Sequence, residues 1–409
     1  MTRLRAWQAA HERALARLEL GLVVAMPLLF LVAALIKAHP FVDDTPLLVS
    51  PTGELLPGNG DDWFSYKIHA INILRGGLAE PAIGKYVFTV HGFLYNYFVA
   101  GIFAIFGVNT SVVYVVQTAL VGASPSILYA AIRLIRGRIP HLAAIAFILV
   151  AAGQLYIDYF RYLSFFLMSE NLFLFLFSVT FLAYAWAFGR RSHAGAVAAG
   201  ILLGLTVLSR ISANVAALGV IAVAPAYFLF YRRGSARLTM TLALAAGFLL
   251  AMSLFPLREY AATGQPDLDV FLVKHGWDTP PAELSEWPGY YGARWLFVFG
   301  IPQWLAVYDP GIIDYRVRPH WMVECVGVIG YLVTRFTWRR VPDLREFVML
   351  TFLTLYLSAY VFVSTIENYG GRSISVALPL AAVFGAFLLC ELLGDPIPKR
   401  SGPVGAGAS

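Results

Sequence analysis

Apolar blocks of about 20 residues, separated by short clusters of arginine and lysine, dominate this sequence of 409 residues. A helix needs about 20 apolar residues to cross the hydrocarbon core of a bilayer. Only 13% of the residues are charged, whereas soluble domains carry about 25%. The net charge of +6 arises from the clusters between the blocks, which is typical of cytoplasmic loops and not of a nucleic-acid-binding surface. We therefore predict an all-α polytopic membrane protein without a nucleic-acid partner.

The positions of the basic residues predict which loops are cytoplasmic. Arg3, Arg5, Arg13 and Arg17 precede an apolar run, 18–36, that is too long for the core of a signal peptide. We expect a retained first helix with the N-terminus in the cytoplasm. Five further clusters should also be cytoplasmic: Arg133-Arg136-Arg138, Arg190-Arg191, Arg232-Arg233-Arg237, Arg335-Arg339-Arg340-Arg345 and Lys399-Arg400.

The charge pattern decides one ambiguous region of the chain. If both apolar blocks at 87–106 and 110–133 crossed the membrane, the Arg133 cluster would lie outside. The first block is interrupted by Thr89, His91 and Asn96, so we predict an amphipathic or re-entrant segment there. The prediction is then about ten membrane spans: 18–37, 110–133, 139–157, 168–188, 194–210, 213–231, 238–257, 320–334, 346–365 and 374–393.

This topology gives a single transmembrane domain, 1–400, followed by a Gly- and Ser-rich tail, 401–409, that we expect to be disordered. It also leaves three segments on the outer side: 38–109, 158–170 and 258–320. The predicted cytoplasmic loops are all short. We therefore expect the functional surface to face outward.

Two adjacent acids in the first outer segment are candidates for chemistry. Asp61 and Asp62 precede a stretch in which Tyr66, Ala70, Ile73 and Leu74 recur at helical spacing. The acids then stand at the N-terminus of a helix on the membrane surface. They either stabilise that helix end through its dipole or supply a catalytic carboxylate.

Two more acids flank the short second outer segment. Glu170 precedes a strongly apolar run, where an ionisable group is costly unless it is paired or used. It either caps the following helix together with Ser169 or belongs to a site. Asp158 either pairs with Arg161 or takes part in substrate binding.

Four basic residues on the outer side are candidates for substrate binding. Arg210 and Arg372 lie at predicted outer helix ends, where each either grips a phosphate group or forms an ion pair, such as Arg372 with Glu367. Lys274 and His275 lie in an aromatic-rich stretch of the third outer segment. Such a stretch is typical of a sugar-binding wall but also of interfacial aromatic anchors. We find no Gly-rich phosphate loop and no Cys/His metal-binding set.

Taken together, these motifs resemble those of the GT-C superfamily of membrane glycosyltransferases, which includes protein O-mannosyltransferases and lipid A aminoarabinose transferases. The resemblance lies in five segments. They are the acids followed by a Tyr-containing helix and Gly76-Gly77, the Phe106-Gly107 pair, Glu170, the 204–210 segment and the 367–379 segment. Two features depart from the family pattern: the sequence lacks the large soluble C-terminal domain of many members, and Asp43 and Asp44 add further acids to the first outer segment.

The resemblance implies an inverting transfer from a polyprenyl-phosphate sugar to a glycan, lipid or protein acceptor. Asp62, with Asp61 as the next candidate, would be the general base, because an attacking hydroxyl must lose its proton. Glu170 would position the acceptor or, with Asp62, hold Mg²⁺ or Mn²⁺. Arg372 or Arg210 would neutralise the departing phosphate. The expected location is a bacterial inner membrane, with both termini cytoplasmic and the site periplasmic.

Three other classes of protein remain open from the sequence. A flippase or transporter for lipid-linked glycans should show internal repeats and polar residues at mid-membrane depth, whereas the predicted helices are mostly apolar at their centres and we detect no repeat. An O-antigen ligase or polymerase uses similar donors but usually carries its site in a late outer loop rich in Arg and His. A non-catalytic scaffold would leave the outer acids and arginines without a shared cavity.

Overall fold

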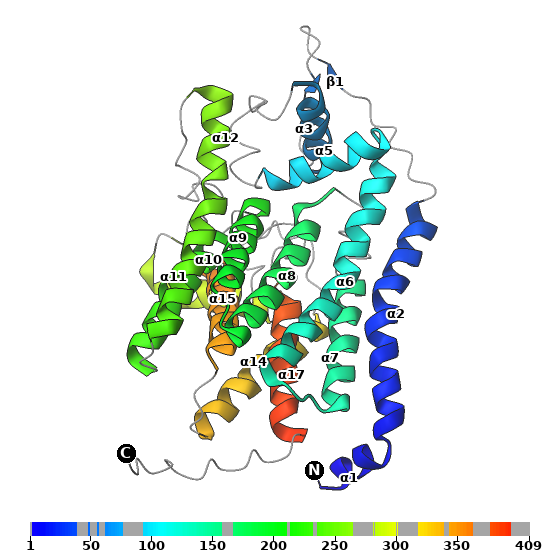
Figure 1. The fold of residues 1–409 in the computed structure, drawn as a ribbon, viewed down its shortest axis with the longest axis vertical. Helices are drawn as coiled ribbons and strands as arrows, with labels where there is room; N and C mark the ends of the chain where they lie inside the picture. The colour runs from blue at the N-terminus through cyan, green and yellow to red at the C-terminus, as the bar shows by residue number, and fades with distance from the viewer. Residues whose placement is uncertain are drawn as a thin grey trace.

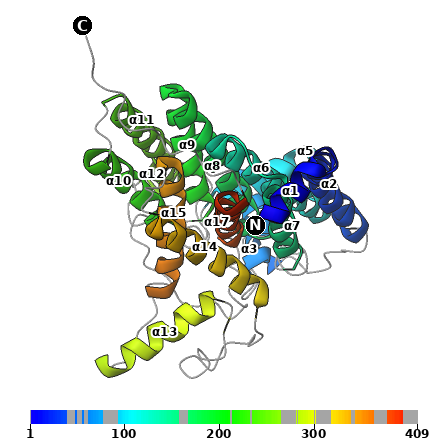
Figure 2. The same ribbon diagram turned by 90° about the horizontal axis from the view of Figure 1, so that it is seen from below.

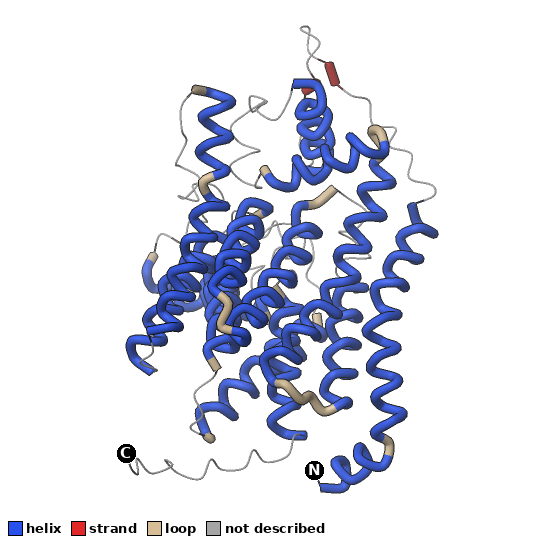
Figure 3. The backbone as a smooth tube through the Cα atoms, viewed as in Figure 1, coloured by secondary structure: helices blue, strands red, loops and turns tan. Residues whose placement is uncertain are grey.

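The computed structural model describes residues 2–38, 48–49, 55–56, 62–76, 93–157, 167–210, 213–231, 235–264, 281, 283–299, 301, 318–338, 343–362 and 377–393. Nearly all of these residues are helical (Figure 1). Two short strands, β1 (Leu48–Val49) and β2 (Leu55–Leu56), pair antiparallel beside helix α3 (Figure 3). The all-α prediction is therefore confirmed for the described part of the chain.

Helices occupy every position at which the sequence predicts a span. Their bounds are α1 (Thr2–Ala10), α2 (Glu12–Ala38), α3 (Asp62–Gly76), α5 (Leu94–Phe106), α6 (Thr110–Arg136), α7 (His141–Gln154), α8 (Ser169–Arg190), α9 (His193–Ser209), α10 (Asn214–Tyr231), α11 (Ser235–Met252), α12 (Leu254–Thr263), α13 (Trp287–Val298), α14 (Pro319–Thr337), α15 (Leu344–Phe362) and α17 (Leu378–Leu393). A short 3₁₀ turn, Leu284–Glu286, precedes α13.

Four helical segments among the described residues are long and apolar enough to cross a membrane. They are Glu12–Ile36, Thr110–Arg136, Ser169–Arg190 and the joined α11–α12 segment Leu238–Ala261. The predicted total of about ten spans stays a prediction. The predicted span 238–257 lies within the last of these segments, and the helix continues past a break at Ser253 to Thr263.

The helices form a bundle whose two ends differ. In Figure 1, α1 and the C-terminal ends of α6, α8 and α17 lie at the lower end, while α3 and the C-terminal end of α12 lie at the upper end. Seen from below, α17 lies near the centre, with α2 and the α10–α11 pair at opposite edges (Figure 2). The main helix pairs are α2–α6, α6–α8, α8–α9, α9–α11, α10–α15 and α14–α17.

The segment that the charge pattern excluded from spanning runs across the bundle. α5 lies over its upper end and contacts α3, α6 and α9 (Figure 1). Its 13 residues reach only about 20 Å as a helix, less than the hydrocarbon thickness of about 30 Å. The structure thus agrees with the predicted amphipathic segment between the first two spans.

Glycines bring α9 and α11 into close contact. A Cβ atom on Gly200 would lie 2.0 Å from the Leu244 carbonyl oxygen, and one on Gly247 would lie 2.1 Å from that of Val197. Small residues of this kind let helix backbones approach closely, and the resulting van der Waals packing is a main driving force for helix association in membranes.

Gly200→Ala is expected to lower the free energy of unfolding in detergent by about 1–3 kcal/mol, because the added methyl group overpacks the α9–α11 contact. Gly153→Ala in α7 is the matched control, since its Cβ would meet nothing within 4 Å. That change should be neutral or stabilising by up to about 1 kcal/mol. Equal stabilities for the two variants would contradict the close α9–α11 contact.

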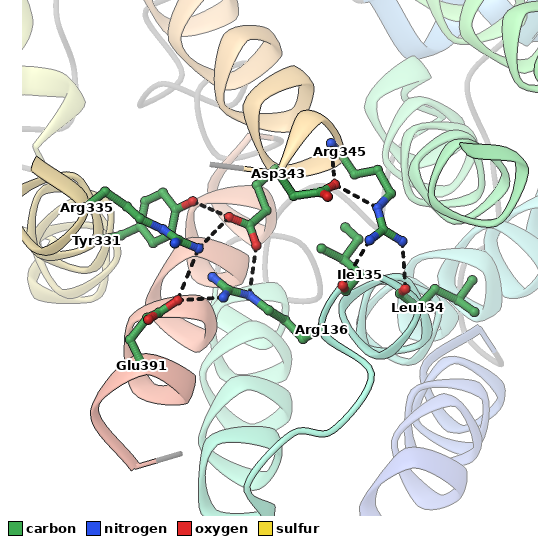
Figure 4. A network of polar contacts seen from close by, with 9 residues as sticks. Leu134, Ile135, Arg136, Tyr331, Arg335, Asp343, Arg345 and Glu391 are labelled. Carbon is green, nitrogen blue, oxygen red and sulfur yellow. Dashed lines mark hydrogen bonds and ion pairs between the residues drawn. The ribbon is translucent and has the colours of Figure 1, made fainter. Parts of the chain in front are cut away.

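The arginine clusters that the structure describes gather at the lower end of the bundle. Arg136 of α6 lies 2.9 Å from Glu346 and 2.6 Å from Glu391, and Arg335 of α14 lies 2.8 and 3.1 Å from the same two carboxylates (Figure 4). The Tyr331 hydroxyl donates to Glu346 at 2.6 Å. This network joins α6, α14, α15 and α17 at one level. Its ion pairs explain why Glu346 and Glu391 occur in otherwise apolar helices.

Candidate functional site

Helix α3 begins at Asp62, as the sequence predicts. The helix expected from the spacing of Tyr66, Ala70, Ile73 and Leu74 is present. Tyr66, Ala70 and Ile73 are buried, whereas Leu74 is 42% exposed. Tyr66 fixes the helix through an edge-on contact with Tyr95 of α5, with ring centroids 4.7 Å apart.

The structure brings Glu170 and Arg210 together beneath α5. Arg210 follows the last residue of α9, and its guanidinium lies 2.8 Å from the Glu170 carboxylate at the start of α8. The Glu170 side chain is 1% exposed and that of Arg210 is 6% exposed. Of the two alternatives for Arg210, the ion pair is therefore present. The capping alternative for Glu170 is wrong, because no side chain caps α8 and its N-cap residue is Met168.

Further buried polar side chains surround this ion pair. Tyr95 donates its hydroxyl to Gln117 of α6 at 2.8 Å. Burial raises the pKa of Tyr95 well above its ordinary value, and the neighbouring Tyr66 and Glu170 add to this effect. Other polar residues at this end are no more than 2% exposed: Asn96, Thr118, Ser169, Asn171, Ser209 and Asn214. Such a concentration is costly unless the groups are hydrogen-bonded or used in function.

Three basic side chains also lie at this upper end of the molecule. Lys67 and His69 of α3 and Arg258 of α12 are all buried. The Arg258 Nε donates to the Tyr97 hydroxyl at 3.4 Å, and its guanidinium forms an ion pair with Glu259. Burial, and to a smaller extent the charge of Arg258, lowers the pKa of His69 to about 4. His69 is therefore neutral at physiological pH.

The neutral state of His69 predicts a pH dependence of stability. Its folded pKa of about 4 lies below the ordinary 6.5, so the unfolded chain binds the proton first and stability falls as pH drops from 6.5 towards 4. The loss should reach about 3 kcal/mol. Unfolding in detergent from pH 7.5 to 4.5 should show this loss in wild type and in His11→Gln, an exposed control. His69→Gln should lose less, and identical profiles for all three proteins would contradict the assignment.

The remaining predicted site residues lie outside the described residues: Asp61, Asp158, Lys274, His275 and Arg372. Asp62 is placed only as the first residue of α3. No group of three metal-ligating side chains occurs within the described ranges, so a site for Mg²⁺ or Mn²⁺ stays a prediction. The structure thus places Glu170 and Arg210 in contact. It does not test the roles expected of the other candidate residues.

Several polar residues of the site were missed in the sequence. Gln117 lies in an apolar block, and Tyr95 lies in the segment expected to be amphipathic. The sequence signal that could have identified them is a polar residue near the end of an otherwise apolar block.

In the third outer segment, Arg294 is buried and stacks over Tyr290 at 5.2 Å, and it donates a hydrogen bond to the Tyr290 hydroxyl. This arrangement favours a structural role for Arg294 over an exposed sugar-binding wall.

No protein-family model matches the chain, and no curated protein matches it. Among solved structures, the chain is similar to the crystal structure of an oligosaccharyltransferase from Archaeoglobus fulgidus, which was solved with a disulfide-tethered acceptor peptide containing the NVT sequon. The TM-score is 0.45 and the sequence identity 14%, over 89% of this chain and 49% of the archaeal chain. This chain therefore matches about half of the archaeal enzyme's length, and the functional proposal rests on its own residues.

Proposed function

We infer that the chain is an inverting glycosyltransferase of the membrane. It moves a sugar from a polyprenyl-phosphate donor to a glycan, lipid or protein acceptor at the non-cytoplasmic face. The observation that carries this proposal is the buried Glu170–Arg210 ion pair at the upper end of the bundle. α5 lies across this end, which is opposite the arginine clusters (Figure 1).

The location of the polar groups supports an enzyme site at the membrane boundary. Buried polar residues gather at the ends of α5, α8 and α9 nearest Glu170, namely Asn96, Ser169, Asn171 and Ser209. Ser124, Ser178 and Thr180 are buried at mid-helix, where each hydroxyl donates to the backbone carbonyl four residues earlier in its own helix. A polyprenyl tail lies in the hydrocarbon, so its phosphate and sugar meet the protein at this depth. A carboxylate and an arginine held there can orient an acceptor hydroxyl and neutralise the leaving phosphate.

We assign the general base to Asp62. It is the first residue of α3, one turn before Tyr66, which packs against Tyr95. In the transfer, an acceptor hydroxyl oxygen bonds to the anomeric carbon while the bond from that carbon to the phosphate oxygen breaks. The hydroxyl proton passes to Asp62, or to Asp61 as the next candidate. The polyprenyl phosphate leaves with the bonding electron pair.

The other candidates have supporting roles. Glu170 orients the acceptor and holds Arg210 in place, and Arg210 and Arg372 neutralise the departing phosphate. Asp158, Lys274 and His275 contribute to substrate binding. Asp62 and Glu170 are the residues that we expect to hold a divalent ion, Mg²⁺ or Mn²⁺. The proposed location is a bacterial inner membrane with a periplasmic site and cytoplasmic termini.

Proteoliposomes test this function against the flippase alternative. The purified chain is reconstituted with a radiolabelled polyprenyl-phosphate sugar and an envelope extract as the source of acceptor. A glycosyltransferase should move label out of the donor and release unlabelled polyprenyl phosphate. Label that changes leaflet but stays on the donor would instead identify a flippase and overturn the proposal.

A further inference from the structure

A cavity of about 350 Å³ lies at the lower end of the bundle, far from the site described above. It is bordered by the last residues of α8, by the beginning of α15 and by Leu134 near the end of α6. Its charged lining residues are Arg190, Arg191, Arg345 and Asp343. Three positive charges and one negative charge leave a formal charge of +2, which favours an anionic ligand.

One wall of the cavity is held rigidly. The Arg345 guanidinium donates to the carbonyl oxygens of Leu134 at 2.8 Å and Ile135 at 3.2 Å, and to Asp343 at 2.8 Å (Figure 4). These contacts close the C-terminal end of α6 against the start of α15. Arg345 therefore shapes the cavity and adds a fixed positive charge to its wall.

The other two arginines of the cavity lining do not hold helices together. Arg190 and Arg191 are exposed, and neither makes a side-chain hydrogen bond or ion pair with any residue of the described ranges. Their guanidinium groups are therefore available to a ligand, and arginine pairs well with phosphate through its planar fork of N–H donors.

The backbone at Arg191 gives a second, independent indication. Arg191 ends α8 in the left-handed region, with φ 55°, and is the one non-glycine residue with positive φ in the described part of the chain. The corresponding residue at the end of α12, also in the left-handed region, is Gly264, with φ 73°. Glycine is the usual residue at such a helix end. Arginine there carries a backbone cost that glycine would avoid, which favours a role for its side chain.

The surroundings favour a lipid over a soluble ligand. Trp186, which lines the cavity one turn before Arg190, is 45% exposed. Tryptophan beside arginine is typical of the membrane–water interface, and basic pockets between membrane helices bind phospholipid headgroups. The predicted topology places this end at the cytoplasmic surface. We propose that the cavity binds the phosphate of an anionic phospholipid headgroup, with Arg190 and Arg191 as its ligands.

Lipid binding by the purified full-length chain in neutral detergent tests the proposal. Fluorescent phosphatidylglycerol is titrated against wild type, Arg190→Gln/Arg191→Gln and Arg13→Gln/Arg17→Gln. The last pair is a matched control, because both arginines are exposed residues of α2 outside the cavity. We expect the cavity pair to weaken binding about 25-fold, or about fivefold per arginine, and the control pair to leave the affinity nearly unchanged.

A third variant separates lipid binding from simple damage to the fold. Arg191→Gly should raise the melting temperature in neutral detergent, because glycine relieves the left-handed backbone, and should still weaken phosphatidylglycerol binding about fivefold. Equal losses in the two double variants would reveal diffuse surface charge and overturn the site. Binding of phosphatidylcholine as tight as that of phosphatidylglycerol, or full displacement by inorganic phosphate, would also overturn it.

Discussion

Replacing Asp62 by asparagine should lower the rate of sugar transfer by about 10²–10⁴-fold, while the affinity for the polyprenyl-phosphate donor stays close to that of wild type. Asparagine keeps the size and polarity of the side chain at the first residue of α3. It cannot accept the proton of an attacking hydroxyl. The variant therefore removes the proposed chemistry without removing the helix that carries it.

Asp61→Asn is the matched control for this experiment, since it changes the neighbouring acid in the same way. Rates and donor binding are measured in parallel for both variants. A large loss in Asp61→Asn alone would move the base by one residue. Transfer unaffected in either variant would contradict a base at the head of α3 and make Glu170 the next candidate.

Glu170→Gln should lower the free energy of unfolding by about 3–5 kcal/mol, because it leaves the Arg210 guanidinium buried without its counter-charge. The side chains of this pair lie 2.8 Å apart and are 1% and 6% exposed, so little solvent can compensate. The measurement is denaturant unfolding in detergent micelles. Transfer should fall as well, since Arg210 loses the group that positions it.

The double variant Glu170→Gln/Arg210→Gln tests whether the two side chains act as a pair. It should lose less stability than the sum of the two single variants, because both buried charges are gone. Glu286→Gln, at an exposed position, serves as the control and should behave like wild type. Strictly additive losses would show that the two side chains act independently.

Much of the fold could be predicted because membrane helices follow simple rules. Block length and arginine position sufficed to locate a helix at each predicted span, including the choice of 110–133 over 87–106. Helical spacing predicted the helix that carries Tyr66, Ala70 and Ile73.

The sequence predicted individual residues of the site but not the contacts between them. Glu170 and Arg210 were both candidates, but their pairing depends on how α8 packs beside α9, which no local pattern specifies. The same holds for Tyr95 with Gln117 and for the arginine–glutamate network around Glu346 and Glu391. Such contacts join segments whose relative register is fixed only by tertiary packing.

The anomeric configuration of the product tests the central claim most directly. Purified protein is given a polyprenyl-phosphate sugar of known configuration, and the configuration of the transferred sugar is read from the one-bond carbon–proton coupling in its NMR spectrum. A single displacement assisted by Asp62 predicts complete inversion, with one polyprenyl phosphate released for each sugar transferred. Retention of configuration would require a covalent sugar–enzyme intermediate or another double displacement, and would contradict the role assigned to Asp62 and the proposed inverting mechanism.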